Sequence, residues 1–440
     1  MPRTAESVLP ALRRISRSIQ RLGRQFTRLP LSRIGPGFIT GVADDDPSGI
    51  ATYSQAGAQH GFGMLWTMPL AYPLMAVIQS MCARLGRVTG KGLAANLKDE
   101  FPPALVTSVV ALLLAANVLN IAADVAAMGE VAELVTGVDR HLMSAVFVVT
   151  SLLLQVLVAY HRYVFFLRWL TLSLLAYAAV LVMVDVPWAQ VARQTVWPGL
   201  KLDAQAAATI VAVFGTTISP YLFFWQASEE VEDMRVTPGA APLLQDRGAA
   251  PAELRRIGWD TWSGMLYSNV AAYCIILAAA VTLHAGGLTD ISSAAQAASA
   301  LRPLAGDFAY LLFAAGILGV GLIGVPVLAG SAAYALAEAM GWEWGLERKV
   351  GEARGFYAVI AISLLAALAI QFSPISPMKA LFWSAVINGI VAVPLLVLII
   401  VLVSRKSVMG PYTAGRPSSA LAWLAVLLMG AAGLRMFMLD

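Results

Sequence analysis

The sequence has little charge and few of the residues that build common catalytic sites. Only 13% of its 440 residues are Asp, Glu, Lys or Arg, about half the fraction usual in soluble domains. Its two cysteines, Cys82 and Cys274, lie in different apolar segments, which argues against a disulfide framework or a thiolate metal site. The sequence contains no HExxH, GxSxG or Walker A motif, so we expect neither an enzyme, nor a bound cofactor, nor transport driven by ATP within this chain.

Hydrophobic residues make up 59% of the chain and gather in repeated stretches of about 18 to 25 residues. Each stretch is long enough for a helix to cross an apolar layer of about 30 Å. A spanning backbone must satisfy its own hydrogen bonds, and no barrel-like alternation is present, so we predict an all-α polytopic protein in a lipid bilayer. About eleven spans are expected, at 35–58, 64–83, 104–135, 142–160, 163–185, 206–228, 259–284, 306–340, 355–371, 378–403 and 418–437.

The distribution of Lys and Arg predicts a cytoplasmic N-terminus in the inner (plasma) membrane. With that orientation most basic residues fall on the cytoplasmic side, as the positive-inside rule requires. The net charge of +4 then reflects a basic membrane face rather than a nucleic-acid-binding surface. The basic residues that fall on the outer side of the membrane are Arg140, Arg193, Lys201, Arg302, Lys379 and Arg435.

The predicted organisation is a short basic segment followed by one membrane domain. Residues 1–34 carry many arginines and no apolar signal-peptide core, so they form either a helix on anionic headgroups or a disordered basic leader. Residues 35–440 form the membrane domain, and a monomer is compatible with the sequence. Within it we expect repeat one at about 35–185, repeat two at about 206–403 and an extra helix at about 418–437.

The first span is interrupted by three consecutive acids in Ala43-Asp44-Asp45-Asp46-Pro47-Ser48-Gly49. Each Asp costs about 2.5–3.5 kcal/mol at a helix centre, so these side chains must line a cavity or pair with a partner. Pro47 lacks a backbone N–H and Gly49 has a low helix propensity, so the helix should unwind here and free carbonyl groups. Carboxylate and carbonyl oxygens together suit a hard cation.

The sixth span is interrupted in a similar way at Thr216-Thr217-Ile218-Ser219-Pro220-Tyr221. Pro220 alone would indicate only a kink. Breaks at corresponding positions of two halves indicate an inverted-repeat transporter whose site lies at the bilayer midplane. In the predicted topology both first half-helices end at the centre, where their C-terminal carbonyl groups offer negative potential to a cation.

These motifs resemble the Nramp (solute carrier 11) family of metal transporters, and the resemblance extends over nearly the whole chain. It is carried by Gly-Pro-Gly-Phe at 35–38, Asp-Pro-Ser-Gly at 46–49 and the proline-centred break in span six. The family has the LeuT fold, a 5+5 inverted repeat with discontinuous helices 1 and 6. The resemblance implies that Asp46 is a metal ligand and that Ala43 and Thr216 contribute carbonyl oxygens.

Three positions depart from the family pattern, which reads Asp-Pro-Gly-Asn at the first break and Met-Pro-His at the second. Gly49 replaces the ligand Asn, Ser219 replaces the ligand Met, and Tyr221 replaces the His. Without the soft sulfur, preference shifts toward Mg²⁺ and Mn²⁺. The small residues leave room for an ion that keeps part of its water shell, with Asp45 adding field or a water-mediated contact. This pattern resembles the Nramp-related magnesium transporters.

Span three places Asn117, Asn120 and Asp124 on one helical face. Asp124 resembles the first residue of the family's Asp-x-x-Glu proton route, but Ala127 stands at the Glu position. Proton coupling is therefore not expected. Asp124 remains open to a second interpretation, as a polar residue that contacts another helix.

Four further residues are assigned to the pathway with an alternative for each. Asn388 in span ten lies either near the ion or in a helix–helix hydrogen bond. Gln226, Glu229 and Glu230 extend from the second half of span six, and they either line the inner exit or form a charged face at headgroup level.

Three functional hypotheses follow. The first is transport of Mg²⁺, and also Mn²⁺, by alternating access without proton coupling. The second is a proton-coupled Mn²⁺ and Fe²⁺ carrier of the same family. The third is a permease of the LeuT fold for amino acids or other organic solutes, which should direct half-helix N-termini toward a carboxylate and would not tolerate adjacent acids.

Overall fold

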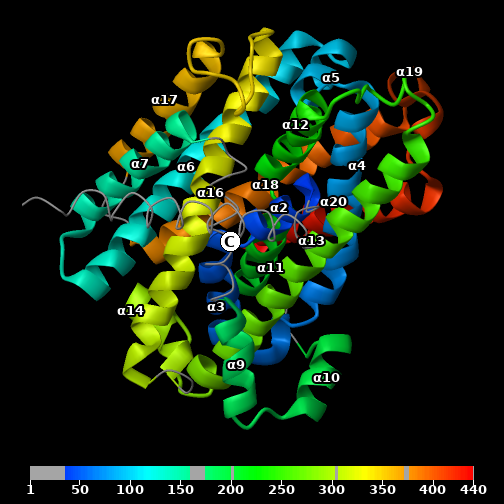
Figure 1. Ribbon diagram of the computed structural model, residues 1–440. Coiled ribbons are helices and arrows are strands. Elements are labelled where there is room, and N and C mark those ends of the chain that lie inside the picture. Colours follow the sequence, from blue (N-terminus) through cyan, green and yellow to red (C-terminus); the bar gives the residue numbers. More distant parts are fainter. Residues whose placement is uncertain (1–34, 159–173, 200–202, 303–305, 371–375, 440) are drawn as a thin grey trace, which may run out of the picture. The chain divides into compact units, whose positions relative to one another are not determined.

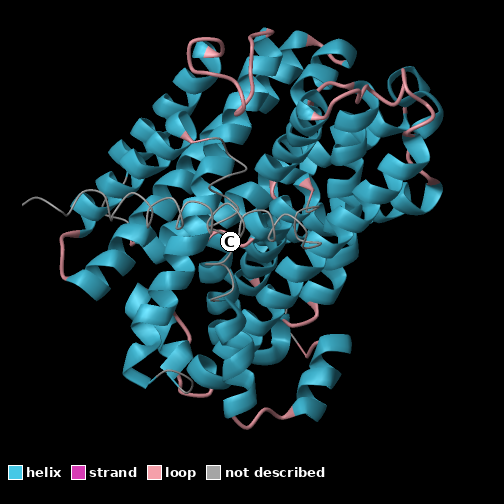
Figure 2. Ribbon diagram, viewed as in Figure 1, coloured by secondary structure: helices cyan, strands magenta, loops and turns pink. Residues whose placement is uncertain are grey.

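The computed structural model describes residues 35–158, 174–199, 203–302, 306–370 and 376–439. In these ranges Figure 2 shows helices joined by loops and turns, with no strand. Residues Pro36–Asp440 form one compact unit. The all-α prediction is confirmed, whereas the basic segment 1–34 lies outside the described residues.

The described chain is built from long helices with a few short ones between them. The α-helices are α2 (Pro36–Asp44), α3 (Pro47–His60), α4 (Thr67–Thr89), α5 (Leu93–Glu100), α6 (Pro103–Thr136), α7 (Arg140–Leu157), α9 (Leu175–Met183), α10 (Trp188–Val196), α11 (Ala204–Thr217), α12 (Pro220–Val236), α13 (Ala250–Ala279), α14 (Ala294–Ala298), α16 (Ala309–Met340), α17 (Arg354–Ile370), α18 (Pro377–Ser404), α19 (Lys406–Met409) and α20 (Arg416–Leu439). Short turns of other helix types are η2 (Gly61–Met64), η4 (Ala280–His284), η5 (Ser299–Leu301), η6 (Gly306–Phe308) and η7 (Gly410–Tyr412).

A described helix falls in each predicted span. In the described residues 7 helical segments are long and apolar enough to cross a membrane, counting α11 with α12 as one segment. Two more, Pro47–Met64 and Thr67–Thr89, pass the same test only as a pair, and they are bent by 112° relative to each other. The 17-residue α17 is a shorter apolar helix, and α9 is the described part of the span predicted at 163–185.

Both predicted breaks are present, and each lies just before a proline. Between α2 and α3, Asp46 is extended, with φ −70° and ψ 173°. Between α11 and α12, Ser219 is also extended, with φ −79° and ψ 131°. A residue before proline avoids the helical region, and proline itself fits the first helical position, so the same local rule ends one half-helix and starts the next.

Glycines bring the two breaks close to neighbouring helices. A Cβ on Gly41 of α2 would lie 2.3 Å from the carbonyl carbon of Gly264 on α13, so the two backbones touch there. In the second half, a Cβ on Gly215 of α11 would lie 2.4 Å from the backbone nitrogen of Gly389 on α18. Small residues permit such close helix packing in a membrane protein. The helices α2 and α11, which lead into the breaks, therefore pack in backbone contact with α13 and α18.

The half-helices of the two breaks lie against each other near the middle of the bundle. Figure 1 shows α2, α3, α11 and α12 in the central region, and contacts join α2 to α12 and α3 to α11. Each half of one broken span thus meets the opposite half of the other, as expected for an inverted repeat. The space between the breaks is enclosed by α6, α13, α16 and α18, each of which contacts at least one of the half-helices.

Candidate cation site

Asp46 is a buried carboxylate at the N-terminus of α3, with 1% of its surface exposed. Its Oδ1 accepts hydrogen bonds from the Ser48 hydroxyl at 2.6 Å and from the Gly49 N–H at 2.9 Å. Its Oδ2 accepts one from the Tyr221 hydroxyl at 3.2 Å. An acidic N-cap is stabilised both by the free N–H groups of the first turn and by the helix dipole. Local folding thus fixes the orientation of this carboxylate before any ion binds.

The structure brings four of the predicted ligands together around the first break. The Ala43 carbonyl oxygen lies 3.4 Å from the Tyr221 hydroxyl, which also bonds Asp46. The Thr216 hydroxyl lies 3.5 Å from that of Ser48. A Cβ added to Gly49 would meet Thr216 Oγ1 at 3.4 Å. Polar groups from α2, α3, α11 and α12 therefore meet in one small cluster.

The Ser219 hydroxyl is turned toward its own helix in this structure. Its hydroxyl donates to the carbonyl oxygens of Gly215, at 2.9 Å, and Thr216, at 2.8 Å. The side chain thus satisfies carbonyl groups that the end of α11 would otherwise leave without partners. The Thr216 carbonyl keeps one further lone pair for a ligand, since a carbonyl oxygen has two.

Asp44 and Asp45 meet a helix that does not belong to either break. The Ser268 hydroxyl of α13 lies 2.7 Å from Asp44 Oδ2 and 3.1 Å from Asp45 Oδ1. The remaining oxygens, Asp44 Oδ1 and Asp45 Oδ2, are buried without a hydrogen-bond partner in the described chain. Asp45 is therefore bonded toward α13, whereas the partners of Asp46 belong to α3 and α12.

The polar face predicted on the third span is buried on α6. Asn117 donates to the Leu328 carbonyl at 2.9 Å and to the Ser331 hydroxyl at 2.8 Å, both on α16. Asn120 and Asp124 are fully buried, and their side chains have no hydrogen-bond partner among the described residues. Asp124 nevertheless lies close enough to Asp46 for the two charges to interact, and it is near the Ser48 N–H.

Two other predicted pathway residues are, like Asp124, buried without a hydrogen-bond partner among the described residues. The amide groups of Gln226 on α12 and Asn388 on α18 find no hydrogen-bond partner within the described ranges. Buried polar groups without partners are rare in folded proteins and call for water or an ion. Together with Asp124 they indicate a hydrated interior around the broken helices.

The acids at the end of α12 tie that helix to its neighbours. Glu229 accepts a hydrogen bond from Tyr334 of α16 at 3.2 Å. Glu230 is completely buried and forms an ion pair with Arg256 of α13, which also bonds Glu253 at 3.1 Å. Arg87 of α4 joins the same network through Glu253. These contacts tie α12 to α13 and α16 at the end of the bundle that carries α5.

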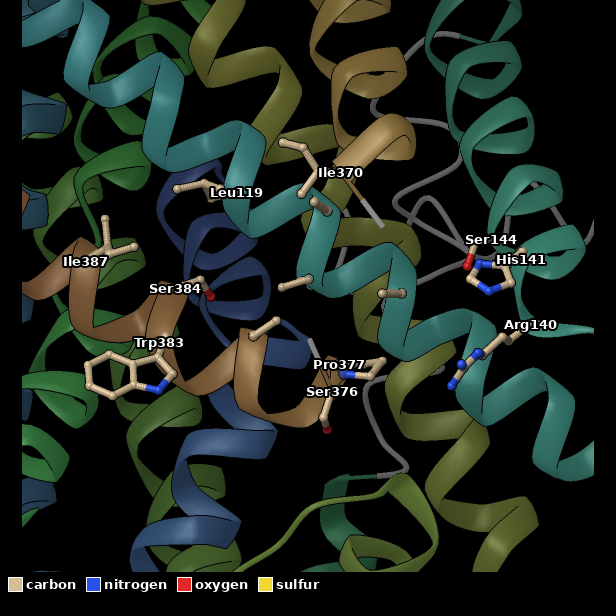
Figure 3. A pocket seen from close by; sticks show the side chains of 14 residues that line it. Leu119, Arg140, His141, Ser144, Ile370, Ser376, Pro377, Trp383, Ser384 and Ile387 are labelled. Carbon is tan, nitrogen blue, oxygen red and sulfur yellow. The ribbon is translucent and has the colours of Figure 1, made fainter. Parts of the chain in front are cut away.

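Two cavities lie beside the site without reaching the predicted ligands. Figure 3 shows the larger, about 410 Å³, between α6, α7, α17 and α18, where Trp383 and Ser384 face it from α18 and Arg140 and His141 from α7. The second, about 380 Å³, is lined by Ala51 of α3 and by parts of α11, α18 and α20. Trp383 borders both. A path through the second cavity would approach the break along α3.

Sequence reasoning missed Tyr53, Ser268 and Arg256. Tyr53 follows Asp46 by seven residues on one helix, so helical spacing alone could have placed its ring on the same face. The ring indeed lies beside Gly49, at 3.3 Å from where a Cβ would be. Ser268 and Arg256 are placed by α13, and the sequence carries no signal for which face of that helix meets the break.

Carboxylates alone do not form a metal cage here. Within the described residues no group of three His, Cys, Asp or Glu side chains is arranged to hold a metal ion. An ion at Asp46 would instead be bound by one carboxylate, backbone carbonyls, hydroxyls and water. Such an all-oxygen set suits a hard cation.

A family model described as "Natural resistance-associated macrophage protein-like", Nramp, matches residues 37–439. The chain belongs to the Nramp family. A divalent metal cation transporter MntH from Acidiphilium cryptum is 31% identical over 64% of this chain and 59% of its own length. The MntH of Erwinia tasmaniensis is 27% identical over 70% of this chain and 72% of its own. The match thus spans less than two thirds of the first relative, and neither relative distinguishes the magnesium branch.

Solved structures show the same Nramp fold. The Eremococcus coleocola manganese transporter aligns with a TM-score of 0.73 and 17% identity over 93% of this chain and 86% of that one. Mhp1, a nucleobase-cation-symport-1 family transporter, aligns with a TM-score of 0.53 and 16% identity, covering 92% of this chain. The predicted LeuT fold, with its inverted repeat and broken helices 1 and 6, is confirmed.

Proposed function

We propose that this Nramp protein carries divalent metal cations across the membrane, with a preference for Mg²⁺ and with Mn²⁺ as a second substrate. The observation that carries the proposal is the Asp46 carboxylate, buried at a helix break beside the Ala43 carbonyl and the Thr216 hydroxyl. A buried, oriented carboxylate is costly unless a cation visits it. The names of its relatives, divalent metal cation transporters and a manganese transporter, support this class of substrate.

The preference for a hard ion rests on the oxygen atoms around Asp46. The groups that bond or border it come from hydroxyl, amide and carbonyl groups of Ser48, Gly49, Tyr221 and Ala43. Gly49 offers no side-chain ligand where the family has an amide, because a Cβ there would already meet Tyr53 at 3.3 Å, and the Ser219 hydroxyl bonds carbonyl groups of its own helix. Mg²⁺ gives up water reluctantly and keeps several water molecules when it binds, so a site with few protein ligands favours it.

The transport cycle is proposed to be alternating access. The cavity beside Ala51 reaches toward the break along α3, while buried contacts of Glu229 and Glu230 hold the other end of the bundle closed. We assign the closed end to the cytoplasm from the positive-inside rule, with the N-terminus on that side of the plasma membrane. The transporting unit is residues 35–440, in two repeats with an extra final helix.

Coupling to protons is not part of this proposal. Ala127 and Tyr221 occupy the two positions at which the family resemblance gives proton-transferring side chains. The second candidate, a proton-coupled Mn²⁺ and Fe²⁺ carrier, is favoured by one observation: Asp124, buried and without a hydrogen-bond partner in the described chain, lies near Asp46. An organic-solute permease is the third candidate, and the adjacent acids at the break argue against it.

The test is flux into proteoliposomes containing the full chain. Uptake of Mg²⁺, Mn²⁺ and Ca²⁺ is measured separately while an internal dye records pH, with Asp46→Ala and empty vesicles as matched controls. We expect Mg²⁺ and Mn²⁺ uptake by the wild type, no internal pH change, and no uptake by the variant. Acidification that accompanies Mn²⁺ uptake would support the proton-coupled alternative.

Two results would overturn the assignment. Uptake by Asp46→Ala at the wild-type rate would remove Asp46 from the site. Absence of all three ion fluxes in folded, correctly inserted wild-type protein would leave the organic-solute permease as the better hypothesis.

A further inference from the structure

The hydroxyl of Tyr221 lies between two groups assigned to the cation. Tyr221 is the second residue of α12 and is buried, with 1% of its surface exposed. Its oxygen is 3.2 Å from Asp46 Oδ2 and 3.4 Å from the Ala43 carbonyl oxygen. Both are acceptors, and a phenol has a single proton. The hydroxyl therefore lies slightly farther from Asp46 than in a typical O–H···O hydrogen bond and shares its proton with Ala43.

A tyrosine hydroxyl at this position is better suited to bond a water molecule on the ion than to coordinate the ion directly. A neutral phenol oxygen is a weak ligand for a hard cation compared with a carboxylate or water. It keeps two lone pairs, however, and can accept a hydrogen bond from a water molecule bound to the ion while donating its own proton to Asp46.

The surroundings provide other partners for such water. On the Gly49 side, the Thr216 and Ser48 hydroxyls lie 3.5 Å apart, next to the edge of the Tyr53 ring. The Tyr53 hydroxyl is buried and makes no hydrogen bond of acceptable geometry within the described ranges. A water molecule needs two to four polar partners to be held in a protein interior, and the hydroxyls of Ser48, Thr216 and Tyr221 are the partners near Asp46.

We propose that Tyr221 determines ion specificity by holding a water molecule on the bound ion, which favours an ion that keeps part of its hydration shell. The inference rests on the proposed transport of divalent cations at Asp46. Mg²⁺ gains most from this contact because it retains water at protein sites, whereas Mn²⁺ exchanges water for protein ligands more readily.

The test compares Mg²⁺ and Mn²⁺ in Tyr221→Phe, which removes the hydroxyl and keeps the ring. KM and maximal rate are measured for each ion in proteoliposomes, and Kd for each ion by calorimetry in detergent. We expect the KM and Kd for Mg²⁺ to rise about tenfold, the effect of one hydrogen bond lost in a buried site. The values for Mn²⁺ should change less than about threefold.

The matched control is Tyr177→Phe, which removes another buried tyrosine hydroxyl, on α9. Both ions should keep their wild-type constants in it. A second variant, Tyr221→His, places a shorter polar ring at the same position. It should shift the Mg²⁺ to Mn²⁺ ratio in the same direction as Tyr221→Phe, because its nitrogen falls short of the phenol oxygen.

The outcomes separate this inference from the function on which it depends. Equal changes for both ions, or no change in any Tyr221 variant, would overturn the role in specificity and leave Tyr221 as a packing residue of α12. Failure of the wild type to bind or transport either ion would instead refute the proposed function.

Discussion

The two helix breaks share one backbone design and differ in what their side chains do. In each, an extended residue precedes a proline that starts the second half-helix. At the first break Asp46 carries a charge and accepts hydrogen bonds from three groups. At the second, Ser219 turns its hydroxyl back to the carbonyl groups of its own helix. The backbone is interrupted at both places, but only the first break carries an acidic side chain.

This difference between the two breaks indicates that the halves of the inverted repeat contribute different chemical groups. The first half supplies the carboxylate and the Ala43 carbonyl. The second half supplies two neutral groups, the hydroxyls of Thr216 and Tyr221. An ion held between them would contact both halves at once, so its binding can respond to their relative movement.

The largest effect is expected from removing the charge of the first break while its helix cap is kept. Asn caps a helix as well as Asp, so Asp46→Asn should fold. Removing one partner of a buried charge interaction costs about 3–5 kcal/mol, so uptake at low ion concentration should fall by about 100-fold or more. Initial rates of Mg²⁺ and Mn²⁺ uptake, at matched amounts of inserted protein, check this. Rates within a few-fold of wild type would show that the two breaks do not differ as described.

A smaller effect is expected when an amide side chain is introduced at Gly49 of the first break. Gly49→Asn introduces an amide oxygen that can replace a water molecule of the ion, so Mn²⁺ should be favoured over Mg²⁺ by about tenfold relative to wild type. Competition between the two ions for uptake measures the ratio. Gly49→Ala is the control for volume, since its Cβ would lie 3.3 Å from Tyr53 Cε2 and 3.4 Å from Thr216 Oγ1. The same change in ratio in both variants would contradict this explanation.

Asp45 should matter less than its neighbour because its bonded partner is Ser268 of α13. In Asp45→Asn we expect the KM to rise about fivefold for Mg²⁺ and Mn²⁺ alike. The loss corresponds to about 1 kcal/mol from a nearby charge in a site that holds water. Uptake measured over a range of ion concentrations gives both constants. A loss as large as that of Asp46→Asn would make Asp45 a direct ligand.

The smallest effect on transport is expected at the second break. Ser219→Ala leaves two carbonyl groups of α11 without the serine hydroxyl, so stability should fall by about 1 kcal/mol. Transport should change less than about twofold, since Ser219 is not bonded to the first break. Thermal unfolding in detergent and uptake at low Mg²⁺ give the two readouts. A large rise in KM with unchanged melting temperature would identify Ser219 as a ligand.

Much of the fold was predictable because it follows from local rules. The length of the hydrophobic stretches predicts the spans, and a proline that follows a polar residue predicts each break. The match between breaks in corresponding spans gives the inverted repeat. Helical spacing predicted that Asn117, Asn120 and Asp124 share one face of a helix, and all three are buried.

Contacts between distant segments were not predictable in the same way. Ser268 bonds Asp44 across 224 positions of sequence, and Tyr221 bonds Asp46 across 175. Such pairs depend on how helices rotate when they pack, and the packing here is set by backbone contact at glycines such as Gly41 and Gly264. The composition of one helix does not reveal which of its faces will meet another.

The most direct test of the central claim is to locate a bound ion. Crystals of the full chain grown with Mn²⁺ should show an anomalous difference peak at about 2.0–2.3 Å from an Asp46 carboxylate oxygen, with the Ala43 carbonyl and ordered water completing its coordination. A peak beside Asp44, Asp45 and Ser268, or at the second break without contact to Asp46, would contradict the account.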